Sequence, residues 1–347
     1  MKTTYVKAVR DTLASEIARD DRVFVMGEDV EVLGGVFGAT RDLAKEFGGD
    51  AYTSDPTPNG LKKHCHDEIA HAKCFNTPIS EAGIIGAGLG AACVGMRPVV
   101  ELMYMDFTLV AMDQIVNQVA KTRYIFGGKA KIPLVIRGQQ GIGRGNAATH
   151  SQSLETLFMH IPGLKVACPS TPADVAGLLR TAIRDDNPVM FFEHKALYNT
   201  KGEVPDDPDF MIPFGKADIK REGKDVTIVA NLLYVGRALD AAKELEKEGI
   251  SAEVIDPRTL CPFDYDTIVE SVKKTGRLVT VHEAHRTAGW GAEVASEISE
   301  RAFKYLDAAP VRLGTKQCPL PFNVGLETAA TPQVADIIAA CKAVCYK

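Results

Sequence analysis

Short apolar runs alternate along this chain with longer stretches in which apolar residues recur at helical spacing. Runs rich in β-branched and aromatic residues predict buried strands, here at 23–26, 99–102, 134–136, 165–167 and 189–192. Helical spacing covers 111–124, and a cap residue followed by proline opens another helix at Thr171 that runs to about Ile183. Strands that alternate with helices predict an α/β domain whose parallel sheet is covered on both faces.

The composition changes just after residue 200. Residues 201–209 are charged and proline-rich with few apolar side chains, which is typical of a linker, and we place the linker at 201–214. Beyond it the alternation restarts, with strands expected at 226–230, 252–255, 278–281 and 311–313 and helices at 236–248, 264–274, 291–303 and 332–344. The 347 residues therefore predict an α/β domain at 1–200 and a smaller α/β domain at 215–347.

Residues 48–74 are polar and fit neither domain, so we interpret them as an insertion. They carry side chains of the types that bind zinc or iron, namely His64, Cys65, His66, His71 and Cys74. The spacings match no standard metal site. A solvated surface segment is therefore the favoured interpretation, and a scaffold or metal-binding module is the alternative.

Charge and cysteine content narrow the function classes. The net charge is −5 with scattered basic residues, which argues against a nucleic-acid surface. The apolar run 82–96 is shorter than the roughly 20 residues that span a bilayer, and the first residues lack the apolar core of a signal peptide. Eight dispersed cysteines are typical of reduced thiols. We expect a cytoplasmic protein that binds neither nucleic acid nor membranes.

Glu81 stands directly before the apolar run 82–96. A carboxyl group against so much apolar surface loses hydration, which favours its neutral form, and proton transfer at neutral pH uses such groups. The alternative is a helix start, in which Ser80 caps the helix and Glu81 complements its dipole. The pattern alone leaves both interpretations open.

A glycine-rich loop at 137–152 follows the expected strand 134–136 and carries His150. Ligands of parallel α/β sheets bind at the carboxyl ends of strands, and a histidine there is a candidate acid or base, so we favour a functional loop over a flexible one. A later pair, His282 and His285, flanks Glu283 just after a strand but does not have the spacing of a zinc-protease helix. We expect a structural or interface role for that segment, and contact with a cofactor or substrate is the less favoured alternative.

The chain has no Gly-Asp-Gly motif followed some thirty residues later by Asn, and no phosphate-binding loop. If the protein uses a diphosphate cofactor, another chain must hold the phosphate end.

Ordered motifs over nearly the whole chain resemble one family, the beta subunits of the thiamine-diphosphate-dependent component of 2-oxo acid and acetoin dehydrogenase complexes. They include Thr77-Pro78-Ile79-Ser80-Glu81, His150-Ser151-Gln152 and further segments at 27–30, 95–98, 112–115, 121–124, 161–166, 182–188 and 255–260. The resemblance implies a pyrimidine-binding domain followed by a transketolase C-terminal-like domain. The 48–74 segment is longer than the connection usual in the family.

The resemblance also implies site residues. Glu81 would bond a ring nitrogen of the cofactor aminopyrimidine and thereby activate the cofactor, while Met103 and Phe107 would pack on the pyrimidine ring. His150 would assist later steps and transfer to a lipoyl group, and Glu28 would lie near the cofactor. A structural potassium site in some members, built largely from carbonyl oxygens, corresponds here to Leu134, Ala182, Ile183, Asp185 and Asn187.

Partners and substrate follow from the same resemblance. An alpha subunit would bind magnesium and the diphosphate within an α2β2 heterotetramer, and the second domain would dock on a lipoyl-bearing dihydrolipoamide acyltransferase core. The loop 141–150 and segment 193–198 resemble acetoin and pyruvate members, with acetoin slightly favoured. A branched-chain 2-oxo acid dehydrogenase and a transketolase-type synthase fragment are the alternatives.

Overall fold

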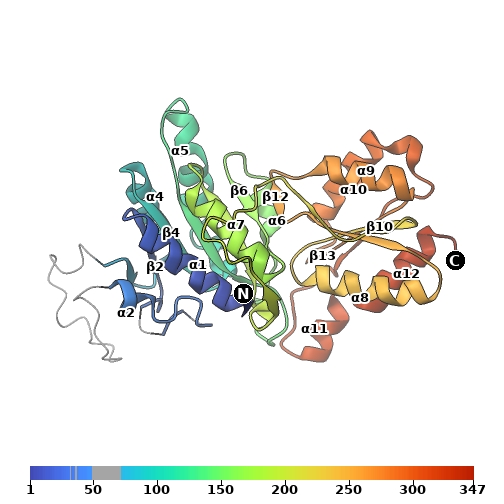
Figure 1. The fold of residues 1–347 in the computed structure, drawn as a ribbon, viewed down its shortest axis with the longest axis horizontal. Coiled ribbons are helices and arrows are strands. Elements are labelled where there is room, and N and C mark those ends of the chain that lie inside the picture. Colours follow the sequence, from blue (N-terminus) through green and yellow to red (C-terminus); the bar gives the residue numbers. More distant parts are fainter. Residues whose placement is uncertain (32, 36, 49–71) are drawn as a thin grey trace.

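The computed structural model describes residues 1–31, 33–35, 37–48 and 72–347, and it divides into two α/β domains (Figure 1). The predicted insertion therefore lies almost wholly outside the described residues, and so do His64, Cys65, His66 and His71.

The first domain is built on a sheet with the strand order β12-β6-β7-β5-β4-β2-β3. Its parallel strands confirm the predicted parallel sheet: β2 (Val23–Gly27), β3 (Cys74–Asn76), β4 (Arg97–Leu102), β5 (Val135–Gln140), β6 (Lys165–Ala167) and β7 (Val189–His194). The edge strand β12 (Thr259–Cys261) pairs antiparallel with β6 and comes from the second half of the chain. This strand ties the two halves together.

Successive residues of these strands enter two different cores, because side chains alternate across a sheet. Val23, Val25 and Val99 pack with helices α1 (Tyr5–Arg19) and α7 (Pro172–Arg184) on one face. Phe24 and Met26 pack on the other face with α4 (Glu81–Cys93), the π-helix η4 (Gln114–Val119) and α5 (Ala120–Ile125). Helices therefore cover both faces of the sheet, as the sequence predicts.

Within the described residues, two further helices, two 3-10 turns and a two-stranded sheet complete the first domain. They are α2 (Leu43–Phe47), α6 (Glu155–Met159), η3 (Met105–Leu109) and η5 (Lys195–Leu197), with β1 (Lys2–Thr4) paired to β8 (Lys201–Glu203). The Thr171 side chain caps α7 by accepting a hydrogen bond from the Asp174 backbone at 3.1 Å, as expected from its place before proline.

The second domain has the sheet order β14-β13-β10-β11-β9. Its strands are β9 (Asp218–Arg221), β10 (Val226–Ala230), β11 (Ala252–Asp256), β13 (Leu278–His285) and β14 (Val311–Thr315), of which only β9 runs antiparallel among the described strands of this sheet. The helices are α8 (Leu233–Lys247), α9 (Tyr265–Thr275), α10 (Trp290–Arg301), α11 (Val324–Ala330) and α12 (Val334–Val344), and a 3-10 turn η6 (Phe303–Tyr305) follows α10.

The segment predicted as a linker packs on the first domain. Its first residues form β8, and Ile212 is buried against α7, where its backbone N–H donates to Gly177 at 3.2 Å. Asp174 of α7 also accepts hydrogen bonds from Lys220 at 3.0 Å and from Arg258 at 2.8 Å, both in the second domain. Ion pairs with buried members thus join the domains.

Candidate active site

Glu28 and Glu81 follow adjacent parallel strands and are both buried. Glu28 comes directly after β2, Glu81 opens α4 after β3, and their exposed fractions are 7% and 9%. The Thr77 backbone N–H donates to Gly27 at 2.9 Å, which holds the approach to Glu81 beside the end of β2. Burial, and after it the charges of Glu81 and Asp29, raise the pKa of Glu28.

The competing interpretation of Glu81 was a plain helix start with a Ser80 cap. Ser80 is the residue before α4, but its side chain makes no capping hydrogen bond to any described residue. Glu81 is nevertheless in the first turn, where a negative charge complements the helix dipole. Its burial beside Glu28, whose Oε1 has no hydrogen-bond partner within the described chain, goes beyond what a helix start requires.

Met103, Phe107 and His150 extend this site along the same edge of the sheet. Met103 follows β4, Phe107 lies in η3, and His150 lies in the loop after β5. Since β2, β3, β4 and β5 are parallel neighbours, their carboxyl ends meet at one edge. Met103 also lines a cavity of about 610 Å³ together with Asp29 and Arg144.

Aromatic rings surround the His150 imidazole. Its centroid lies 4.9 Å from Tyr104 and 5.3 Å from Phe107, both edge-to-face, and its Nδ1 lies 2.9 Å from the Thr149 hydroxyl. Thus His150 and Phe107, two of the predicted site residues, are in direct contact. Among the described residues, His150 and Glu81 share the sheet edge without a hydrogen bond between them.

Two buried charged residues beside His150 were not predicted. Lys195 donates to the His150 carbonyl at 2.6 Å, and burial lowers the pKa of Lys195 to about 8. Asp106 accepts from the Gln152 backbone at 3.1 Å and from its side chain at 3.0 Å, and burial raises the pKa of Asp106. Both residues come just after expected strands, which is the signal that could have identified them.

The predicted potassium residues gather around the end of α7. The Leu134 carbonyl accepts a hydrogen bond from Val189 at 2.9 Å, and Oδ1 of Asp185 accepts from the backbone and side chain of Asn187, each at 2.8 Å. Leu134 therefore lies beside the turn that holds Asp185 and Asn187.

Several of these carbonyl groups already accept hydrogen bonds. Arg97 Nη1 donates to the carbonyls of Ile183 at 3.0 Å and Asp185 at 3.1 Å, and the Ala182 carbonyl accepts from the Asp185 backbone at 3.3 Å. A carbonyl oxygen has a second lone pair, so these contacts leave acceptor capacity. The potassium site stays a prediction.

The metal-binding alternative can be tested only at Cys74, because the other four residues of the cluster lie outside the described residues. Cys74 is buried in β3, its Sγ faces the Val30 carbonyl at 3.8 Å, and burial raises the pKa of its thiol to about 12. In the described ranges no group of three or more acidic, histidine or cysteine side chains is placed to hold a metal ion. No helix within those ranges combines the length and apolar character that crossing a bilayer requires.

Comparison with known proteins identifies the family of each domain. Residues 1–201 match the family model of the transketolase pyrimidine-binding domain, and residues 215–337 match that of the transketolase C-terminal domain. A solved structure described as a split-gene transketolase, inactive beta4 tetramer, superposes with a TM-score of 0.72 at 25% identity, covering 98% of this chain and 97% of that one.

Curated relatives narrow the family further. The acetoin:2,6-dichlorophenolindophenol oxidoreductase beta subunit of Cupriavidus necator is 47% identical over 96% of this chain and 95% of its own length. The pyruvate dehydrogenase E1 beta subunit of Rickettsia felis is 45% identical over 100% and 99%, and that of Rhizobium meliloti is 44% identical over 99% and 70%. By these full-length relatives and by both matched domains, the chain belongs to the transketolase-like family of pyruvate and acetoin dehydrogenase beta subunits.

Proposed function

We propose that this chain is the beta subunit of a thiamine-diphosphate-dependent dehydrogenase component that acts on acetoin, with pyruvate as the second candidate substrate. The observation that carries the proposal is the buried pair Glu28 and Glu81 at the carboxyl ends of adjacent strands. The unpaired Oε1 of Glu28, which has no partner in the described chain, leaves an acceptor there for a polar ring.

The residues at this edge fit one end of the cofactor. Thiamine diphosphate, when bound, supplies the electron-accepting ring that lets a carbon–carbon bond next to a carbonyl break. Glu81 would hold a proton at an aminopyrimidine nitrogen, and Met103 and Phe107 would offer apolar surface to that ring. His150, with Tyr104 and Phe107 around its imidazole, would move a proton during transfer to a lipoyl group.

The diphosphate end of the cofactor would have to be bound by a partner subunit. The chain has no phosphate-binding motif, so we propose that an alpha subunit holds the diphosphate and magnesium in an α2β2 heterotetramer. We further propose that potassium occupies the turn around Asp185, and that the second domain docks on a lipoyl-bearing dihydrolipoamide acyltransferase core. Acetoin would lose acetaldehyde on cleavage, whereas pyruvate would lose carbon dioxide.

Co-purification with the native alpha partner tests this proposal. The complex should reduce an artificial electron acceptor when thiamine diphosphate, magnesium and acetoin or pyruvate are supplied, and the lone chain should not. A panel that includes branched-chain 2-oxo acids and sugar phosphates separates the alternatives. Turnover by the lone chain would refute the shared site, and turnover of sugar phosphates alone would refute the dehydrogenase assignment.

A variant pair tests the role of Glu81. Glu81→Gln keeps the size of the side chain but removes the carboxyl group, so it should nearly abolish turnover while the complex still assembles. Glu300→Gln makes the same change at an exposed position of α10 and should retain normal turnover. Equal rates in the two variants would contradict the role given to Glu81.

A further inference from the structure

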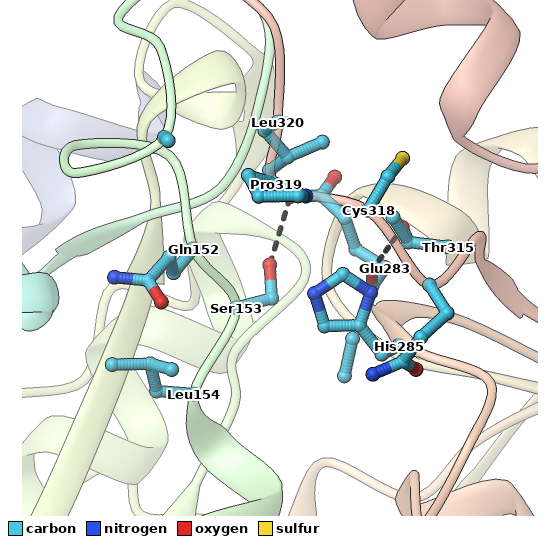
Figure 2. A pocket seen from close by; sticks show the side chains of 12 residues that line it. Gln152, Ser153, Leu154, Glu283, His285, Thr315, Cys318, Pro319 and Leu320 are labelled. Carbon is cyan, nitrogen blue, oxygen red and sulfur yellow. Dashed lines mark hydrogen bonds between the residues drawn. The ribbon is translucent and has the colours of Figure 1, made fainter.

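Glu283 reaches from the second domain to both ends of the His150 loop. It lies in β13 and is buried, with 5% of its surface exposed. Its Oε1 accepts hydrogen bonds from the Ile142 backbone at 2.8 Å and from the Ser153 hydroxyl at 2.9 Å. Figure 2 shows Ser153 and Glu283 facing each other at the pocket between the domains. One carboxylate oxygen thus joins residues before and after His150.

The other oxygen of Glu283 contacts His194 at the end of β7. His194 Nε2 lies 3.0 Å from Glu283 Oε2, and His194 Nδ1 accepts the Ala196 backbone N–H at 3.2 Å. Because Nδ1 is an acceptor, the ring proton is on Nε2, which therefore donates to Glu283. Burial favours the neutral form of Glu283, but the interaction with His194 and the bonds from Ser153 and Ile142 outweigh it and lower the pKa of this carboxyl.

The residue after His194 completes a connection to the active site. Lys195 donates to the His150 carbonyl at 2.6 Å and lies 3.4 Å from the Ser151 hydroxyl. A second carboxylate of the same domain, Glu327, accepts the Gly143 backbone N–H at 3.2 Å. The His150 loop is therefore held at Ile142, Gly143 and Ser153 by the second domain and at its centre by Lys195.

The space beside Glu283 gives the loop room to shift. A pocket of about 280 Å³ lies between the domains and is lined by Gln152 and Ser153 on one side and by Glu283, His285 and Cys318 on the other (Figure 2). When the bonds to Glu283 are lost, the loop can relax into this pocket without meeting a packed core.

We propose that Glu283 is a positioning residue that fixes the His150 loop relative to the carboxyl edge of the first sheet. The second domain then sets the place of His150 as well as taking part in assembly. This inference rests on the proposed function, which gives His150 its role, but the position of the loop can be measured without turnover.

The test compares Glu283→Ala with Glu253→Ala in the assembled α2β2 complex. Glu253 is also a buried carboxyl of the second domain. It accepts hydrogen bonds from the Gly223 backbone at 3.1 Å and from Lys274, and both partners lie away from the loop. Hydrogen–deuterium exchange in peptides covering 141–153 should rise about tenfold in Glu283→Ala and stay unchanged in Glu253→Ala. Equal exchange in the two variants would overturn the proposal.

Kinetics supply the second measurement. Glu283→Ala should lower kcat by about 10- to 100-fold with little change in KM, because a misplaced acid–base group affects the chemical steps more than substrate binding. Glu283→Gln keeps an oxygen for Ile142 and Ser153 but turns an N–H toward His194, so its loop exchange should fall between wild type and Glu283→Ala. Equal exchange in Glu283→Gln and Glu283→Ala would contradict the proposal that one carboxylate oxygen holds the loop while the other contacts His194.

The two proposals fail in different ways. A wild-type complex that turns over neither acetoin nor pyruvate refutes the proposed function, while the exchange data still decide whether Glu283 holds the loop. An active complex whose loop exchange and kcat are unaffected by Glu283→Ala refutes the positioning role alone.

Discussion

Glu81 lies close enough to Glu28 that its charge is, after burial, the second cause of the raised pKa of Glu28. Glu81→Gln removes that charge, so the pKa of Glu28 should fall toward its ordinary value. It should not reach that value, because burial persists. Infrared titration of the protonated carboxyl band in the purified complex measures the shift. Glu300→Gln provides the control, and an identical titration of Glu28 in the two variants would refute the coupling.

Arg137 is fully buried between two glutamates of neighbouring strands. Its Nε donates to Glu193 at 2.6 Å and its Nη1 donates to Glu101. Arg137→Met would leave two buried carboxyl groups without their counter-charge, which should cost about 3–5 kcal/mol of unfolding free energy. Urea unfolding of the complex measures the loss.

Two comparisons separate the charge effect from the change in side-chain volume. Arg301→Met removes an exposed arginine that pairs with Asp266 on the surface, and it should change stability by less than about 1 kcal/mol. Adding Glu101→Gln and Glu193→Gln to Arg137→Met should restore much of the lost stability. If Arg137→Met unfolds like Arg301→Met, the buried network does not support the sheet.

The pattern of apolar residues predicted the central strands of the sheet well, because successive side chains of each strand enter the cores on opposite faces. Residues 23 and 25 enter one core and residues 24 and 26 the other, so a continuous apolar run marks a strand covered on both faces. The antiparallel edge strand β12 was not predicted, because its three residues become a strand only by pairing with β6 across the domain boundary.

The candidate active site likewise combines residues that a local pattern identifies with residues that only long-range contacts identify. Glu81 and His150 stand out because they lie beside an apolar run and within a glycine-rich loop. Lys195 and Glu283 lie near the ends of predicted strands, but their partners are residues 45 and 141 positions away in the chain. Spacing within a segment carries no information about such contacts, and the fold alone brings these groups together.

Gly141 begins the His150 loop with a positive φ of 94° and little space around its Cα. A Cβ at this position would lie 2.3 Å from His194 Nε2 and 2.6 Å from Glu283 Oε1. Gly141→Ala should therefore separate these two groups and lower turnover by about 100-fold, as measured by steady-state kinetics of the complex.

A second glycine with a positive φ provides the control for backbone strain in Gly141→Ala. Gly249 has a positive φ of 75° and no described neighbour within 4 Å of an added Cβ. Gly249→Ala should lower stability by about 1 kcal/mol through strain and leave turnover unchanged. Comparable losses of turnover in the two variants would mean that strain, rather than the contact with His194 and Glu283, explains the effect at Gly141.

We expect His282 to make folding sensitive to acid. The ring is buried 4.9 Å from Trp290, its Nδ1 lies 2.9 Å from the Ala284 carbonyl, and burial lowers its pKa to about 4. The unfolded chain binds a proton at this histidine near pH 6.5, before the folded chain does, so stability should be lost as pH falls from about 6.5 to about 4. The contribution is on the order of 3 kcal/mol, because each unit of difference between the folded and unfolded pKa is worth about 1.4 kcal/mol.

His282→Asn keeps an N–H donor that can face Ala284 but removes the titrating ring. Urea unfolding at pH 7, 6 and 5 should show a variant that is less stable at pH 7, because it loses packing against Trp290, yet depends less on pH than the wild type. His160→Asn changes an exposed histidine and should keep the wild-type slope. If the stability of His282→Asn falls with acid as steeply as that of His160→Asn, another group is responsible for the acid sensitivity.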